Sequence, residues 1–165
     1  MEIKRIIVGP LETNCYLLIL EKECIVIDPG DDFEEIKNAI GDLKLIGCLV
    51  THFHPDHIGA LEELISYYDI EINKPKYGKF EYEIIETPGH TFDSKTFYFQ
   101  KINTMFTGDF IFYSSIGRTD LGGSDKDMKE SLESFKKYND DIVIYPGHGP
   151  KTILGEEKNR FDLYY

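Results

Sequence analysis

The sequence has 165 residues, 41% of them hydrophobic, which predicts a single globular domain over residues 1–165. The formal net charge of −12 argues against a nucleic-acid partner, because binding to phosphate backbones depends on basic side chains. No charge-free stretch approaches the ~20 residues that span a bilayer, and the N-terminus has no apolar signal segment. We therefore expect a cytoplasmic protein without a nucleic-acid or membrane partner.

The three cysteines lie inside apolar runs and show no Cys-x-x-Cys spacing: Cys15, Cys24 and Cys48. This pattern predicts buried thiols in a reducing compartment rather than a zinc ribbon or a redox motif.

Short apolar runs separated by turn residues open the chain. They predict a β-meander of three strands, over Ile3–Val8, Tyr16–Leu20 and Cys24–Ile27. A helix should follow, because Phe33, Ile36 and Ile40 recur with helical spacing. Asp31 or Asp32 can cap this helix, and Gly41 suits its end.

A continuous apolar run, Leu45–Val50, predicts a strand that is covered on both faces. After Pro55, one helix is expected, with its apolar face formed by Ile58, Leu61, Leu64, Ile65 and Tyr68.

The second half repeats this outline. Strands are predicted over Glu81–Glu86, Thr96–Gln100 and Thr104–Phe106, followed by a Gly- and Ser-rich loop over Ser114–Gly123. Ser124 and Asp127 resemble a capping box for a helix that carries Met128, Leu132 and Phe135 on its inner face. Ile142–Tyr145 is the last predicted strand. Helices with one apolar face between sheet segments favour two packed sheets with helices outside.

All five histidines follow predicted strands, at turns. Three stand in one segment with a carboxylate, as His52, His54, Asp56 and His57. His90 and His148 each follow Pro-Gly, and Asp109 follows Thr-Gly. Imidazole and carboxylate are ligands suited to Zn²⁺ or Fe. The spacing predicts that His52 and His54 face one metal and that Asp56 and His57 face a second.

These four motifs, His-x-His-x-Asp-His, Pro-Gly-His-Thr, Thr-Gly-Asp and Pro-Gly-His-Gly, resemble the metallo-β-lactamase-fold hydrolases, and within them the small glyoxalase II-like proteins. The resemblance implies an α/β fold, a four-layered αββα sandwich. It also implies that His52, His54 and His90 hold one metal, that Asp56, His57 and His148 hold another, and that Asp109 bridges them. The implied cofactors are two divalent metal ions. Zn²⁺ is the preferred assignment, and Fe and Mn are the alternatives.

By the same resemblance, the chain is a dinuclear hydrolase of small thioesters, in which hydroxide between the metals attacks the carbonyl. Asp56 would also accept or orient a water proton. The expected partner is a small-molecule substrate. Whether the chain forms a homo-oligomer is left open. Asp28 is either a buried acid that orients a ligand or an Asp-Pro-Gly turn residue. Arg118 is expected to pair with Asp120 or Asp28 rather than with an anionic substrate.

Two other activities use the same pattern: a mononuclear Fe(II) persulfide dioxygenase with His52, His90 and Asp109 as ligands, and a lactonase-type hydrolase. We do not expect a flavodiiron oxidoreductase, a secreted β-lactamase or a nuclease. The chain also departs from the family. Only 32 residues separate His57 from His90, the loop after His90 is Thr91-Phe92-Asp93-Ser94, and no helical domain follows. The short spacing implies a more open site, and the missing helical domain argues against lactoylglutathione as the substrate.

Overall fold

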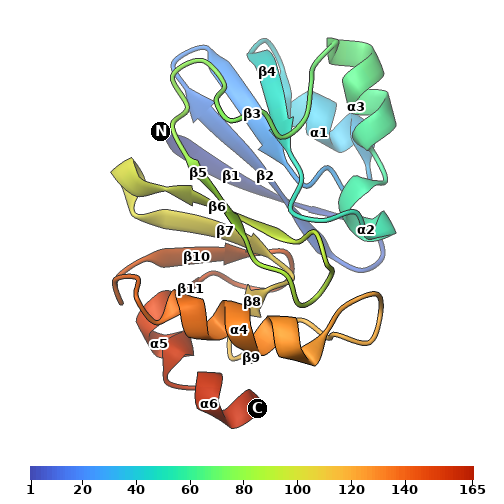
Figure 1. Ribbon diagram of the computed structural model, residues 1–165. Helices are drawn as coiled ribbons and strands as arrows, with labels where there is room; N and C mark the ends of the chain where they lie inside the picture. Colours follow the sequence, from blue (N-terminus) through green and yellow to red (C-terminus); the bar gives the residue numbers. More distant parts are fainter. The chain divides into compact units, whose positions relative to one another are not determined.

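The computed structural model describes residues 1–165, and its contacts divide the chain into two compact units, Met1–Glu81 and Tyr82–Tyr165 (Figure 1). Each unit contains one main β-sheet and several helices, so the predicted mixed α/β class is confirmed. The single domain over residues 1–165 stays a prediction. None of the helices is both long and apolar enough to cross a membrane.

The first unit is built on a four-stranded sheet in the order β1-β2-β3-β4. Its strands are β1 (Glu2–Val8), β2 (Thr13–Leu20), β3 (Glu23–Ile27) and β4 (Lys44–Leu49), and its helices are α1 (Phe33–Ile40), α2 (Pro55–Ile58) and α3 (Leu61–Tyr68). The first three strands pair antiparallel, which confirms the meander, whereas β3 and β4 run parallel.

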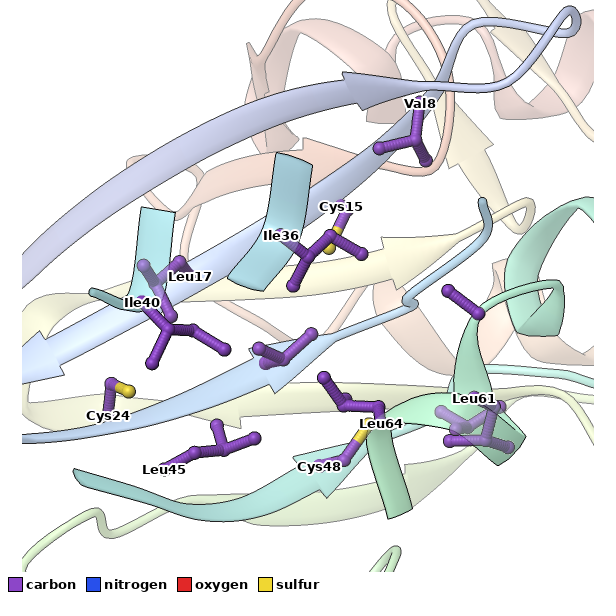
Figure 2. Packing of buried hydrophobic residues seen from close by; sticks show 13 residues of the cluster. Val8, Cys15, Leu17, Cys24, Ile36, Ile40, Leu45, Cys48, Leu61 and Leu64 are labelled. Carbon is purple, nitrogen blue, oxygen red and sulfur yellow. The ribbon is translucent and has the colours of Figure 1, made fainter. Parts of the chain in front are cut away.

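Apolar side chains from this sheet pack against two helices (Figure 2). Ile36 and Ile40 come from α1, and Leu61 and Leu64 come from α3. On β4, the neighbours Cys48 and Leu49 point to opposite faces and are both 0% exposed, as predicted for a strand covered on both sides.

All three cysteines are buried free thiols, as predicted. Burial raises the pKa of Cys24 to about 12 and raises the pKa values of Cys15 and Cys48 well above the usual thiol value.

The prediction of one helix after Pro55 is wrong, because α2 ends at Ile58 and α3 begins at Leu61. The backbone N–H groups of Gly59 and Ala60 leave the helical pattern. They donate instead to the carbonyl oxygens of Gly30 and Pro29, each at 3.0 Å. These tertiary hydrogen bonds therefore break the helix and attach α2 to the loop that follows β3.

The capping of α1 also differs from the prediction. Asp32 occupies the N-cap position, but its side chain makes no capping hydrogen bond. Its Oδ2 accepts a hydrogen bond from the backbone N–H of Gly9 at 2.8 Å, so it fixes the loop between β1 and β2. Gly41 ends the helix as expected, and its N–H donates to Lys37 O.

The second unit contains a five-stranded sheet in the order β11-β10-β7-β6-β5. The strands are β5 (Glu83–Glu86), β6 (Lys95–Phe99), β7 (Thr104–Gly108), β10 (Val143–Pro146) and β11 (Thr152–Ile153). The other elements are the 3-10 helix η1 (Gln100–Ile102), the hairpin of β8 (Ile111–Phe112) and β9 (Ser115–Ile116), and the helices α4 (Asp125–Phe135), α5 (Leu154–Lys158) and α6 (Phe161–Tyr164).

Helix α4 buries Met128, Leu132 and Phe135, as predicted, in a core with sheet residues such as Met105 and Ile144. The Ser124 side chain accepts a hydrogen bond from Asp127 N–H at 3.2 Å, which confirms the cap. The expected loop over Ser114–Gly123 is partly structured, because β9 lies inside it.

A parallel strand pair recurs in both units. Strands β3 and β4 pair in parallel around α1, and β7 and β10 pair in parallel around α4. Parallel neighbours end at the same edge of a sheet, so the loops that follow them meet. The pairing even continues one step further, since Asp28 N–H donates to Leu49 O and Gly147 N–H donates to Gly108 O. Four of the predicted metal ligands follow these parallel strands: His52 and His54 after β4, Asp109 after β7 and His148 after β10.

Candidate metal centre

In the first unit, five predicted polar residues gather where β3 and β4 end. Asp28 directly follows β3, His52 and His54 follow β4, and Asp56 and His57 lie on α2. We call this group the first cluster. The ligand atoms of His52 and His54 lie within 4.8 Å of one another, and so do those of Asp28, His52 and His57.

Asp28 is the buried centre of this cluster, at 1% exposure. Its Oδ1 accepts the backbone N–H of Thr51 at 2.8 Å, and its Oδ2 accepts the Thr51 hydroxyl at 2.6 Å. The same Oδ2 lies 2.8 Å from Nδ1 of His57. Asp28 also has a φ of 54°, which is typical of a turn residue. It therefore serves both as the turn residue and as the buried acid that orients a histidine. A carboxylate on Nδ1 directs Nε2 toward a metal.

Thr51 fixes His52 in a similar way. Its Oγ1 lies 3.0 Å from Nδ1 of His52. Because a hydroxyl has one proton and Thr51 gives it to Asp28, the oxygen can only accept from His52. The neutral imidazole then carries its proton on Nδ1 and presents the lone pair of Nε2. Sequence reasoning missed Thr51, although it directly precedes His52 in the motif.

Asp56 and His57 form the outer part of the first cluster. The Thr13 hydroxyl, from the start of β2, donates to Asp56 Oδ2 at 2.9 Å. That oxygen lies 3.5 Å from Nε2 of His57. Asp56 is thus held by a buried strand residue that the sequence pattern did not reveal.

In the second unit, His90, Asp109 and His148 gather at the ends of β5, β7 and β10; we call them the second cluster. Asp109 Oδ2 lies 3.4 Å from His90 Nε2 and 3.5 Å from His148 Nε2. His90 and Asp109 are nearly buried, whereas His148 is part-exposed. One carboxylate oxygen therefore faces two imidazole nitrogens.

The backbone of Arg118 orients His90. Its carbonyl oxygen lies 2.6 Å from His90 Nδ1, which leaves Nε2 toward Asp109. Gly117 makes this approach possible, since a Cβ there would overlap the carbonyl oxygen of Asp109. The sequence showed no signal for a carbonyl partner, because any residue type can supply one.

The Arg118 side chain forms a two-pronged ion pair with Asp120, both N···O distances being 2.6 Å. The hydrogen bonds from Arg118 lower the pKa of Asp120 to about 2, and the pKa of Arg118 is raised in turn. Both side chains are exposed. The predicted pairing of Arg118 with Asp120 is confirmed.

The loop after His90 is ordered by its own side chains. The Thr91 hydroxyl contacts Asp93 Oδ1 at 2.8 Å and Ser94 Oγ at 2.6 Å, and Ser94 Oγ also accepts the Thr91 N–H. Thr91, Asp93 and Ser94 thus form a compact turn directly beyond a candidate ligand.

The donors in each cluster fit divalent metals. Three donor pairs are 3.4–3.5 Å apart: His57 with Asp56, His90 with Asp109, and His148 with Asp109. Tetrahedral bonds of about 2.1 Å separate neighbouring ligand atoms by about 3.4 Å. Neutral imidazole and carboxylate donors also suit Zn²⁺ and iron alike.

Residues 8–78 and 76–148 match the metallo-beta-lactamase superfamily. The two matched segments meet at residues 76–78, within the stretch of 32 residues that separates His57 from His90. The hydroxyacylglutathione hydrolase GloC of Haemophilus influenzae is 32% identical over 202 aligned positions, which cover 96% of this chain and 95% of that protein. The alignment is longer than the 165-residue chain, so the relative has segments that this chain lacks.

Two solved structures are also similar over nearly the whole chain. The B3 metallo-beta-lactamase BLEG-1 has a TM-score of 0.91 and 28% identity, covering 99% of each chain. TTHA1623 in a di-iron-bound form has a TM-score of 0.86 and 27% identity, covering 93% of this chain and 96% of that one. With histidine and aspartate clusters at the strand ends and this match over most of its length, the chain belongs to the metallo-beta-lactamase superfamily.

Proposed function

We propose that the chain hydrolyses small thioesters with two divalent ions. In this proposal His52, His54 and His90 hold one ion, Asp56, His57 and His148 hold the other, and Asp109 is shared. The observation that carries the proposal is the position of Asp109 Oδ2, 3.4 and 3.5 Å from the Nε2 atoms of His90 and His148. A carboxylate that faces both imidazoles is suited to bridge two ions.

When bound, the ions supply hydroxide near neutral pH and polarise the carbonyl of the substrate. The chain itself orients the ligands: Asp28 fixes His57, Thr51 fixes His52, and the carbonyl of Arg118 fixes His90. The main role of Asp56 in this proposal is that of a metal ligand. Its contact with the Thr13 hydroxyl also places it to orient a proton. A thiolate leaves without much help from an acid, so a thioester suits a site whose histidines are all ligands.

The similarity to the hydrolase GloC supports the substrate class, because hydroxyacylglutathione is itself a thioester. We propose a small-molecule substrate and no nucleic-acid partner, in keeping with the net charge of −12. The three free, buried thiols suit a reducing compartment and support a cytoplasmic location.

The test is metal quantitation combined with a substrate panel. Protein loaded with Zn²⁺, and separately with Fe²⁺, is given thioesters, lactones, a persulfide and a β-lactam. We expect two ions per chain and selective thioester hydrolysis that a chelator abolishes.

Asp109→Asn should reduce the rate by about a hundredfold or more, since a bridging carboxylate is lost. The matched control is Asp141→Asn, an exposed carboxylate in the same unit, which should retain full activity. Thioester turnover that is absent in the loaded protein, or equal in the two variants, would refute the proposal.

One observation favours iron over zinc: TTHA1623 is described in a di-iron-bound form. The second candidate also uses iron but needs a single ion: it is the Fe(II) persulfide dioxygenase, with His52, His90 and Asp109 as ligands. One iron per chain, with oxygen uptake on a persulfide and no thioester hydrolysis, would select this activity.

A further inference from the structure

A pocket of 290 Å³ lies beside Asp56 in the first unit. The loop between β1 and β2 forms one wall, and α2 with the loop after β3 forms the other. The residues that line it include Val8, Leu11, Thr13, Asp31, Asp56 and Gly59. A candidate metal ligand, Asp56, is therefore part of the pocket lining.

Hydrogen bonds and close packing fix the segments that form the walls of this pocket. The N–H of Gly9 is held by Asp32 at 2.8 Å, and Glu12 N–H donates to Gly9 O at 3.2 Å. On the opposite wall, a Cβ at Gly59 would overlap Gly30 O. A Cβ at Gly30 would likewise overlap Asp56 O, so these glycines allow the two backbones of this wall to pack closely.

The lining is apolar except at two carboxylates and one hydroxyl. Val8, at the end of β1 (Figure 2), is buried, and Leu11 is 64% exposed at the mouth. Asp56 is assigned to the metal, and the Thr13 hydroxyl donates to it. Asp31 is the other carboxylate in the lining; it is exposed, and its Oδ1 accepts the backbone N–H of Asp32 at 2.7 Å. None of the lining residues is cationic.

We propose that this pocket binds the acyl group of the substrate, and that Asp31 selects short, uncharged acyl chains over those that end in a carboxylate. This inference rests on the proposed thioester hydrolysis. The volume is near the lower limit of small-molecule pockets, about 300 Å³, which suits a chain of a few carbons. A terminal carboxylate would enter an apolar space and approach Asp31, losing hydration and meeting like charge.

The test compares two acyl groups of equal length, butyryl and succinyl, on the same thiol. Their S-butyl and S-(3-carboxypropyl) thioethers, which cannot be hydrolysed, measure binding separately by calorimetry. The metal-loaded protein should favour the butyryl ester in kcat/KM, and the uncharged thioether in affinity, by about tenfold or more.

Asp31→Lys should reduce both preferences by at least about tenfold, and Asp31→Asn by less, because attraction replaces repulsion only in the first variant. Glu35→Lys is the matched control. It makes the same charge change at an exposed residue in the first turn of α1, outside the pocket lining, and should leave both ratios within about twofold.

Equal use of both acyl groups by the unsubstituted protein, or ratios that Asp31→Lys and Glu35→Lys change alike, would overturn the inference while leaving thioester hydrolysis intact. If neither ester is hydrolysed, the proposed function fails. The thioether affinities would then still decide whether Asp31 selects against a carboxylate.

Discussion

A single hydroxyl proton on Thr51 links two parts of the first cluster. It is donated to Asp28, so the oxygen must accept from His52. Thr51→Val keeps the shape and removes this link, leaving polar atoms of Asp28 and His52 unsatisfied. We expect a loss of about 1–3 kcal/mol in unfolding free energy and of about 10–100-fold in metal affinity.

Competition with a coloured chelator and urea unfolding measure the two effects. Thr51→Ser keeps the hydroxyl and should stay close to the original protein. If Thr51→Val bound metal as tightly as Thr51→Ser, the hydroxyl would have no orienting role.

The buried thiols give a second prediction at this scale. Burial raises the pKa of Cys24 to about 12, and it also raises the pKa values of Cys15 and Cys48 well above the usual thiol value. At pH 8 only about one Cys24 thiol in ten thousand is a thiolate, and it has no access to solvent. A disulfide reagent should therefore label none of the three in the folded protein and all three in denaturant. Rapid labelling without denaturant would contradict their burial.

Residue types predicted the candidate ligands, but not what orients them. The dense motif from His52 to His57 indicated a metal site because its spacing and chemistry are local. The contacts of Thr13 with Asp56, and of Arg118 O with His90, join segments 43 and 28 residues apart. Such pairings depend on how the strands are ordered, which no local pattern shows.

Among the elements, the β8–β9 hairpin supports the second cluster. Gly117, directly after it, lies against the Asp109 carbonyl and close to the His90 ring. Gly117→Ala must push this backbone away, so we expect a loss of about 1–3 kcal/mol and weaker metal binding. Calorimetry and metal titration measure both.

Gly122→Ala is the control for Gly117→Ala. A Cβ at Gly122 meets nothing within 4 Å, although its φ of 86° adds strain. It should therefore cost about 1 kcal/mol and leave metal affinity unchanged. A similar drop in affinity in both variants would show that close approach at Gly117 is not the cause.

The strands and longer helices were largely predictable, because their apolar periodicity reflects burial. The break between α2 and α3 was not, since it depends on carbonyls of Pro29 and Gly30 that lie far away in sequence. Asp32 is the N-cap residue, one of the two predicted, but its side chain does not cap α1, because its carboxylate accepts the N–H of Gly9, 23 residues away.

For the whole molecule, metal binding should add stability by mass action. A ligand at 100 times its Kd stabilises the folded state by about 2.7 kcal/mol. We therefore expect Tm to rise when Zn²⁺ is added to chelator-treated protein, by roughly 5 °C or more at this size. Scanning calorimetry tests this. Asp109→Asn should show a much smaller rise, and an equal rise would mean that the metal binds elsewhere.

The position of the ligands beyond the strand ends has a consequence for how this family can vary. The candidate ligands His52, His54, His90, Asp109 and His148 all lie outside the paired strands. A ligand can therefore be exchanged without altering strand register or either apolar core. One scaffold can then acquire a different metal preference through single substitutions, while the sheets stay unchanged.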